Sequence, residues 1–137
     1  VVANNTIIDT QRVSPSYGTG IILVGLTNAV INANTVSGSK QHGISLQDCN
    51  HCTVTNNVCM DNGDSISGWD GIALGSSSYN NIQGNKCRNN GEYGIAILNS
   101  ACVKNVVTNN DLINGGIDGP LRDSGTNTVT TAGNRLT

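Results

Sequence analysis

The sequence has few charged residues and no long hydrophobic run, and these absences exclude several classes of protein. Of its 137 residues only 12% are charged, with seven Lys and Arg against nine Asp and Glu. There is no basic footprint for phosphate contacts, so we expect no nucleic-acid partner. No run of about 20 apolar residues is present to span a membrane. Residues 1–20 also lack the charged start and apolar centre of a signal peptide.

Helical periodicity is missing as well. Gly, Asn, Ser and Thr are poor helix formers, and no apolar i, i+3, i+4, i+7 stripe continues for three turns. Apolar residues instead alternate with a period of two, as in Ile44 and Leu46 or in Ile72 and Leu74. Alternation of this kind places side chains on one face of a strand, so the sequence predicts short β-strands separated by turns.

What the sequence does contain is a repeat. A Gly-Ile-x-Leu or closely similar segment begins at Gly20, Gly43, Gly71 and Gly94, and each is followed by an aliphatic residue and then by Asn. These glycines are 23, 28 and 23 residues apart, and a half-copy at Gly119 follows after 25. Such a period is typical of solenoids. The repeated asparagines form one predicted column, Asn5, Asn34, Asn57, Asn85, Asn110 and Asn134.

The strands of one copy are too short to pair as hairpins, so each strand should pair with its equivalent in the next copy. Identical units then stack in parallel about 4.8 Å apart, with right-handed crossovers. In this pattern the chain resembles the right-handed parallel β-helix repeats of pectate lyases, polygalacturonases, alginate epimerases, copper-loading β-helix proteins and phage tailspikes. The resemblance covers Val2 to Leu136. It implies an all-β, single-stranded parallel β-helix of about five coils over residues 1–137, with an asparagine ladder along the column.

Both ends of the chain fall within core positions, at Val2 and Leu136. Because solenoids need polar caps, we expect a fragment of a longer chain or a subunit capped by others. The families that the chain resembles imply an extracellular, cell-surface or virion location, and any signal peptide of a secreted parent would lie upstream.

The five cysteines are odd in number and occupy core positions, so packed free thiols are expected. Cys59 and Cys87 fall in one column, where a disulfide is the alternative. Cys49, His51 and Cys52 resemble a metal knuckle, but no second ligand pair follows at zinc spacing. We therefore expect no metal and no cofactor. Nothing in the sequence supports a calcium site, and a copper-loading role is a minor alternative.

Two long loops, residues 9–19 and 60–70, leave the coil at the same turn, two coils or on the order of 10 Å apart. They are predicted to wall a groove whose floor is the turn from Lys40 to His42. The acid–base candidates in this groove are Asp61, Asp64, Asp70 and His42. The sugar-binding candidates are Trp69, Tyr17, Arg12, Lys40, Tyr93 and Glu92.

These residue types suit sugar chemistry. An aromatic ring stacks on a pyranose face, paired acids serve hydrolysis, and a base with a cation or Tyr serves β-elimination. A working groove requires His42 and Asp70 to point outward within one coil spacing, with Trp69 exposed. Alternatively, the polar residues satisfy turn backbone groups and the Trp covers a loop. The residues before each repeat Gly should stack in one column, Thr19, His42, Asp70, Tyr93 and Asp118.

The outward face of the Gly-Ile-x-Leu strands carries no acid or base. Its apolar residues predict contact with another chain, for example in a homotrimer, through Ile22, Val24, Ala73, Ala96 and Leu98. The catalytic motifs of the resembled enzymes are also absent, since Trp69-Asp70-Gly71 matches only half of the pectate lyase Trp-x-Asp-His. The leading hypothesis is a polysaccharide-processing or polysaccharide-binding β-helix. The alternative is a purely structural shaft of a trimeric tailspike, adhesin or surface protein.

Overall fold

The computed structural model describes residues 1–10, 18–63, 68–130 and 132–137, and every regular element among them is a β-strand. No helix among these residues is long and apolar enough to cross a membrane. The strands are short, as the Gly- and Asn-rich sequence predicts. They are β1 (Val2–Ala3), β2 (Thr6–Ile8), β3 (Ile21–Val24), β4 (Val30–Asn32), β5 (Thr35–Ser37), β6 (Ile44–Gln47), β7 (Thr53–Thr55), β8 (Val58–Met60), β9 (Ile72–Gly75), β10 (Asn81–Gln83), β11 (Lys86–Arg88), β12 (Tyr93–Ile97), β13 (Val106–Thr108) and β14 (Gly119–Asp123).

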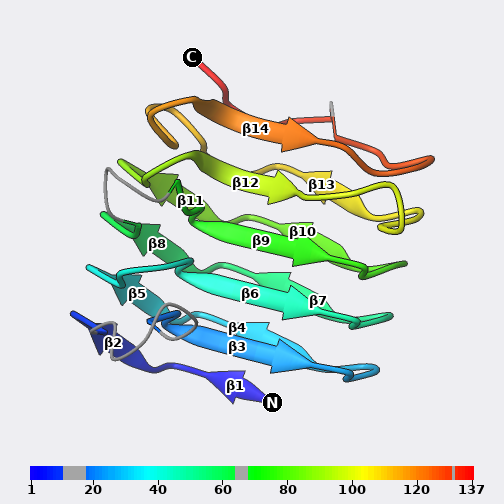
Figure 1. Ribbon diagram of the computed structural model, residues 1–137, viewed down its shortest axis with the longest axis horizontal. Coiled ribbons are helices and arrows are strands. Elements are labelled where there is room, and N and C mark those ends of the chain that lie inside the picture. The colour runs from blue at the N-terminus through cyan, green and yellow to red at the C-terminus, as the bar shows by residue number, and fades with distance from the viewer. Residues whose placement is uncertain (11–17, 64–67, 131) are drawn as a thin grey trace.

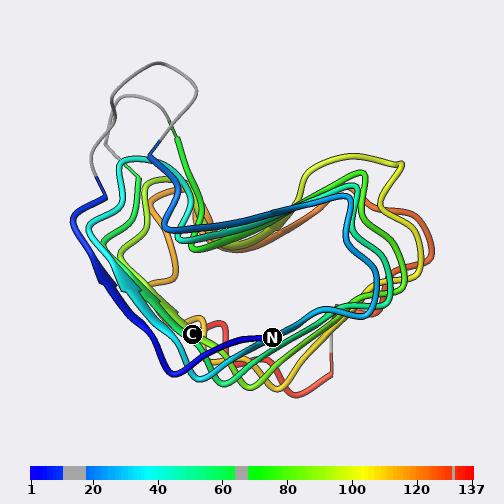
Figure 2. The same cartoon turned by 90° about the horizontal axis from the view of Figure 1, so that it is seen from below.

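These strands form three parallel sheets (Figures 1 and 2). Each of the first four coils contributes one strand to each sheet, and the last coil contributes β13 and β14 to the first and third sheets. The first sheet has the order β1-β4-β7-β10-β13, the second β2-β5-β8-β11 and the third β3-β6-β9-β12-β14. The predicted parallel β-helix is confirmed. Five stacked strands are separated by four steps, so the chain completes about four full turns where about five were expected.

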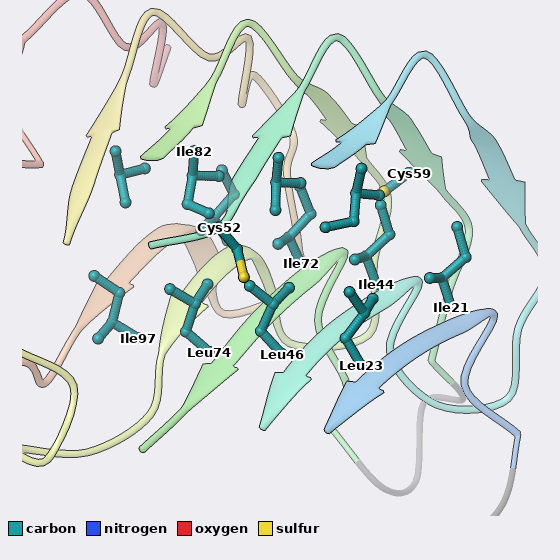
Figure 3. Packing of buried hydrophobic residues seen from close by; sticks show 14 of the residues in the cluster. Ile21, Leu23, Ile44, Leu46, Cys52, Cys59, Ile72, Leu74, Ile82 and Ile97 are labelled. Atoms are coloured by element: carbon teal, nitrogen blue, oxygen red, sulfur yellow. The ribbon is translucent and has the colours of Figure 1, made fainter. Parts of the chain in front are cut away.

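The core consists of residues that repeat in register from coil to coil. Ile44 pairs with Ile72, and Leu46 pairs with Leu74, which places the same side chain shape above itself in successive coils. All four are fully buried, and Figure 3 shows them in rows along the axis. Burial of these rows supplies the main stabilising free energy, at roughly 25 cal/mol per Å² of apolar surface.

Asparagine amides join the coils at the turn between the first two sheets. Asn57 is typical: its Nδ2 donates to Asn85 Oδ1 at 3.0 Å and to the Ile31 carbonyl at 3.1 Å. Its Oδ1 accepts from the backbone N–H and the Nδ2 of Asn34, at 2.9 and 3.0 Å. Each buried amide therefore satisfies polar groups of both neighbouring coils. The same bonds run along Asn5, Asn34, Asn57, Asn85, Asn110 and Asn134.

All five cysteines are buried and free, as predicted for packed thiols. Cys59 and Cys87 are register partners in adjacent coils. The hydrogen bond to the Cys59 thiol, followed by burial, raises the pKa of Cys87 well above its usual value. Burial is also the main cause that raises the pKa of Cys52. Thiols of this kind pack as small apolar groups.

The outward face of the third sheet differs from the prediction. Ala73 and Ala96 are 0% exposed, whereas Ile22 and Val24 are 59% and 60% exposed. Leu98 is half-buried. The expected continuous apolar contact strip is therefore wrong in its middle, because the buried Ala73 and Ala96 leave no exposed surface for a partner. Exposed apolar side chains on this sheet are confined to the first coil.

The asparagine column makes a prediction about stability. Asn57→Ala removes one amide and leaves several buried polar groups without partners, each worth about 1–3 kcal/mol. We expect a loss of at least about 3 kcal/mol in the free energy of unfolding, measured by urea denaturation followed by circular dichroism. Asn5→Ala is the matched control, since Asn5 is exposed at the end of the column, and it should cost less than about 1 kcal/mol. Equal losses in the two variants would contradict this account.

Candidate functional site

The candidate residues lie in the turns that lead into the third sheet, at the left in Figure 2. Backbone N–H groups of Gly20, Gly43 and Gly71 each donate to the carbonyl of the residue before the next repeat Gly, at 3.0 Å. The acceptors are His42, Asp70 and Tyr93, which therefore stack as predicted.

The last member of the predicted column is wrong. Tyr93 pairs with Gly119 and Ile95 pairs with Leu121, so Pro120 and not Gly119 lies beside Gly94. The final turn contains one residue more than the repeat assumes, which moves Asp118 out of the column. Proline is acceptable at this position because β14 ends its sheet.

His42 and Asp70 meet in this column, but they are buried and do not point outward as the groove prediction required. His42 Nδ1 accepts from the Asp70 backbone N–H at 3.0 Å and lies 3.3 Å from Asp70 Oδ2. Asp70 Oδ1 accepts from the Tyr93 backbone N–H at 3.1 Å. A neutral imidazole that accepts at Nδ1 carries its proton on Nε2, so the free ring nitrogen of His42 is a donor.

Trp69 lies against this pair. Its ring meets the His42 ring edge-on, with centroids 4.8 Å apart and an interplanar angle of 89°. The Trp69 side chain is half-buried, so the expected full exposure is not seen. The Trp69 backbone also connects to the next coil, because its carbonyl accepts a hydrogen bond from the Glu92 backbone N–H at 2.9 Å.

Glu92 supplies the titratable carboxyl of the site. Its side chain is 26% exposed, and its Oε1 lies 3.6 Å from Arg122 Nη1. Burial and then the nearby Asp70 carboxyl raise the pKa of Glu92, while Arg122 acts in the opposite direction. A carboxyl with a raised pKa keeps its proton to higher pH, which suits a general acid.

Three buried polar atoms at this turn have no hydrogen-bond partner: Ser39 Oγ, Trp69 Nε1 and Asp70 Oδ2. Ser39 belongs here because its backbone joins Asn62 and Gly63 of the next coil. Among the residues that the structure describes, the one other atom of this kind is Asp111 Oδ1, outside this group. Unpaired buried polar atoms are costly, so their concentration makes this turn the candidate site.

The other predicted residues are placed less centrally. Asp61 is exposed and its Oδ1 accepts from Asn89 Nδ2 at 3.3 Å. Lys40 is half-buried, and its backbone N–H donates to the Thr10 carbonyl. No contact of Asp61 with His42 or Asp70 is found within the described ranges. Asp64, Arg12 and Tyr17 lie outside the described residues.

The knuckle-like segment does not converge on a metal. Cys49 and Cys52 face inward, where their thiols donate to backbone carbonyls, while His51 is exposed and stacks on Tyr79. In the described part of the chain, no group of three or more His, Cys, Asp and Glu side chains is arranged to hold a metal ion.

Sequence reasoning missed Arg122 and the partnerless Ser39. Arg122 is the register partner of Ala96, so it occupies the outward column of the third sheet that was interpreted as bland. A correct register for the last coil would have identified it. Ser39 has no sequence signal, because its importance depends on its burial.

The comparisons with known proteins agree with this fold. The family model described as a right-handed β-helix region matches residues 1–112. A search of solved structures finds the periplasmic alginate epimerase AlgG with a TM-score of 0.78 at 19% sequence identity. That match covers 98% of this chain and 39% of the epimerase, so the chain spans about two fifths of its length. A sequence comparison with curated proteins finds no match.

The environment of Glu92 predicts a pH dependence. Because its folded-state pKa is raised, its contribution to stability is present below the ordinary value of 4.5 and is lost as the pH rises through the folded-state value. Glu92→Gln should therefore gain melting temperature relative to wild type between acidic and neutral pH, with the difference vanishing near pH 4.5. Arg122→Gln should steepen the wild-type dependence. A Glu92→Gln offset that is constant with pH would contradict the assignment.

Proposed function

We propose that this chain, which belongs to the family of right-handed β-helix proteins, binds and processes a polysaccharide at the turn formed by His42, Asp70, Trp69 and Glu92. The observation that carries the proposal is the meeting of an indole, an imidazole and a carboxyl of raised pKa at one turn. The unpaired buried polar atoms at the same turn support it. So does the fold shared with an alginate epimerase.

Each side chain has a role that follows from its environment. Glu92 is the candidate general acid, since its raised pKa favours the protonated form that would donate to the leaving glycosidic oxygen, a step common to hydrolysis and to β-elimination. His42 is buried and meets the Trp69 ring edge-on, so it holds the indole in place as a positioning residue. Asp70 orients His42 and is itself buried, so it acts as a positioning residue. Trp69 offers apolar ring surface for a pyranose.

This function places the protein outside the cytoplasm, where polysaccharides are exposed, in keeping with an extracellular, cell-surface or virion location.

The proposal is tested by depolymerisation of a panel of acidic and neutral polysaccharides, with both unsaturated-product absorbance and reducing ends recorded. Glu92→Gln should lower the rate by about 10²–10⁴-fold, as expected for loss of a general acid. Asp48→Asn, an exposed carboxyl in the turn at the other end of the third sheet, is the control and should retain wild-type activity. Absorbance at the unsaturated product identifies a lyase, and reducing ends alone identify a hydrolase. If folded wild-type protein yields neither product from any polysaccharide in the panel, the proposal is wrong.

A structural role in an assembly is the second candidate. It is favoured by the exposed apolar side chains of the first coil, since Ile22, Val24 and Leu26 are 59%, 60% and 45% exposed. In a trimeric tailspike, adhesin or surface-protein shaft these residues would contact neighbouring chains. Sedimentation at micromolar concentration should then show a trimer that Ile22→Ser with Val24→Ser dissociates. A monomeric wild type would exclude this role for the present chain.

A further inference from the structure

At the opposite end of the third sheet, on the right in Figure 2, the turns into the first sheet contain another column. Its members follow one another from coil to coil through backbone bonds. The backbone N–H of Asn28 donates to the Asn50 carbonyl at 3.1 Å, and that of His51 donates to the Ser78 carbonyl at 3.2 Å. The backbone N–H groups of Tyr79 and Lys104 donate to the carbonyls of Val103 and Thr126, both at 2.9 Å. Every member has positive φ. The column is Asn28, His51, Tyr79, Lys104 and Asn127, with φ from 52° to 59°.

Large side chains are unfavourable in this backbone conformation, which Gly and Asn adopt most readily. The equivalent columns at the other two turns respect that preference. They contain only Asn, Asp, Gly and Ala: Asn4, Ala33, Asn56, Gly84, Asn109 and Gly133 at one turn, and Asp9, Gly38, Asp61, Asn89 and Asn114 at the other. Tyr79 and Lys104 are the exception, whereas His, like Asn and Asp, is enriched in this conformation. Residues held against local preference are a reason to look for a function.

These three residues form a continuous surface feature, which we call the basic-aromatic ridge. The His51 and Tyr79 rings stack with centroids 5.1 Å apart at 16°, and Lys104 Nζ lies 5.7 Å from the Tyr79 ring centroid. Tyr79 is 49% exposed, and His51 and Lys104 are exposed. Among the residues that the structure describes, no side-chain hydrogen bond holds any of the three. The exposure of all three residues leaves the ridge accessible to a ligand.

We propose that the basic-aromatic ridge binds an acidic polysaccharide that runs along the solenoid axis. The imidazole, the phenol and the ammonium all donate hydrogen bonds, and no carboxylate belongs to the column. One donor per coil repeats at about 4.8 Å, which suits carboxylate groups carried on successive sugars of one chain. Such an array recognises a polymer better than a small anion, because each coil adds one weak contact.

The ring contacts of the ridge distinguish this partner from nucleic acid. The Tyr79 ring already contacts His51 and Lys104, so it offers no open face on which a nucleic-acid base could stack. The ridge is also separate from the candidate site, since the two lie at opposite ends of the third sheet. Binding to the ridge can therefore be tested separately from catalysis at the candidate site.

The test is affinity electrophoresis and calorimetry of the wild-type chain with sodium alginate, polygalacturonate, neutral dextran and a single-stranded DNA oligonucleotide. The triple variant His51→Asn, Tyr79→Asn, Lys104→Asn replaces the ridge with the residue that its backbone prefers. We expect at least tenfold weaker binding of the acidic polysaccharides and an unchanged or higher melting temperature. Lys86→Asn removes one exposed positive charge from the second sheet and is the matched charge control, which should bind as wild type.

Several outcomes would overturn the proposal. One is that the wild-type chain does not bind acidic polysaccharides, or binds DNA equally well. Another is that the triple variant binds acidic polysaccharides with wild-type affinity. A triple variant that loses melting temperature would show instead that the stack is a structural support. Trp69→Ala separates the two sites: retained binding supports the ridge, whereas full loss would assign all binding to the candidate site.

Discussion

The structure depends on one constraint: every buried polar group at a turn must find its partner in the next coil. The strands within one solenoid coil do not pair with each other, so the peptide N–H and C=O groups of a coil must find hydrogen-bond partners in neighbouring coils. This holds also at the turns, whose inner side packs against the core. An Asn amide solves the problem because it donates and accepts at once. Asn57 does so for Asn34 and Asn85, with all of these bonds between 2.9 and 3.0 Å. Shifting the register by one residue would break them together, so the amides fix the register along with the apolar rows.

The candidate site is the place where this rule fails. Asn62 and Asn90 continue a shorter amide column at the turn that leads into the third sheet, at 3.1 Å. Beside them, Trp69 Nε1 and Asp70 Oδ2 are buried without a hydrogen-bond partner, and Asp70 Oδ2 lies 3.3 Å from His42 Nδ1. Among the described residues outside this turn, the one other atom of this kind is Asp111 Oδ1. This concentration of unpaired polar atoms is one of the observations on which the proposed polysaccharide site rests.

Much of the fold could be predicted from the sequence because the signal is repeated. A period-two pattern predicts which residues face inward, and its four copies identify the columns of inward residues without ambiguity. The burial of His42 and Asp70 could not be predicted from the pattern. Whether an outward residue near a turn is covered depends on the path of the chain through that turn, and the repeat does not encode that path. The burial of Ala73 and Ala96, which the pattern places on the outward face, could not be predicted either. Arg122 was missed because one extra residue before Pro120 shifts the last coil, and a single-residue shift exchanges which residues stack.

The two ends of the third sheet illustrate how a repetitive core leaves function to its turns. Both ends use the same backbone geometry, with a residue of positive φ at each bend. At one end the column is filled with Asn, Asp and Gly, and the chemistry lies in the side chains that follow, of which Asp70 is buried and Glu92 is partly buried. At the other end the bend itself holds His51, Tyr79 and Lys104, which are exposed. We propose chemistry on a bound sugar where buried groups lie near a carboxyl of raised pKa, and binding of a long chain where exposed donors repeat at coil spacing. A β-helix can carry both because its coils repeat along the direction in which a polymer extends.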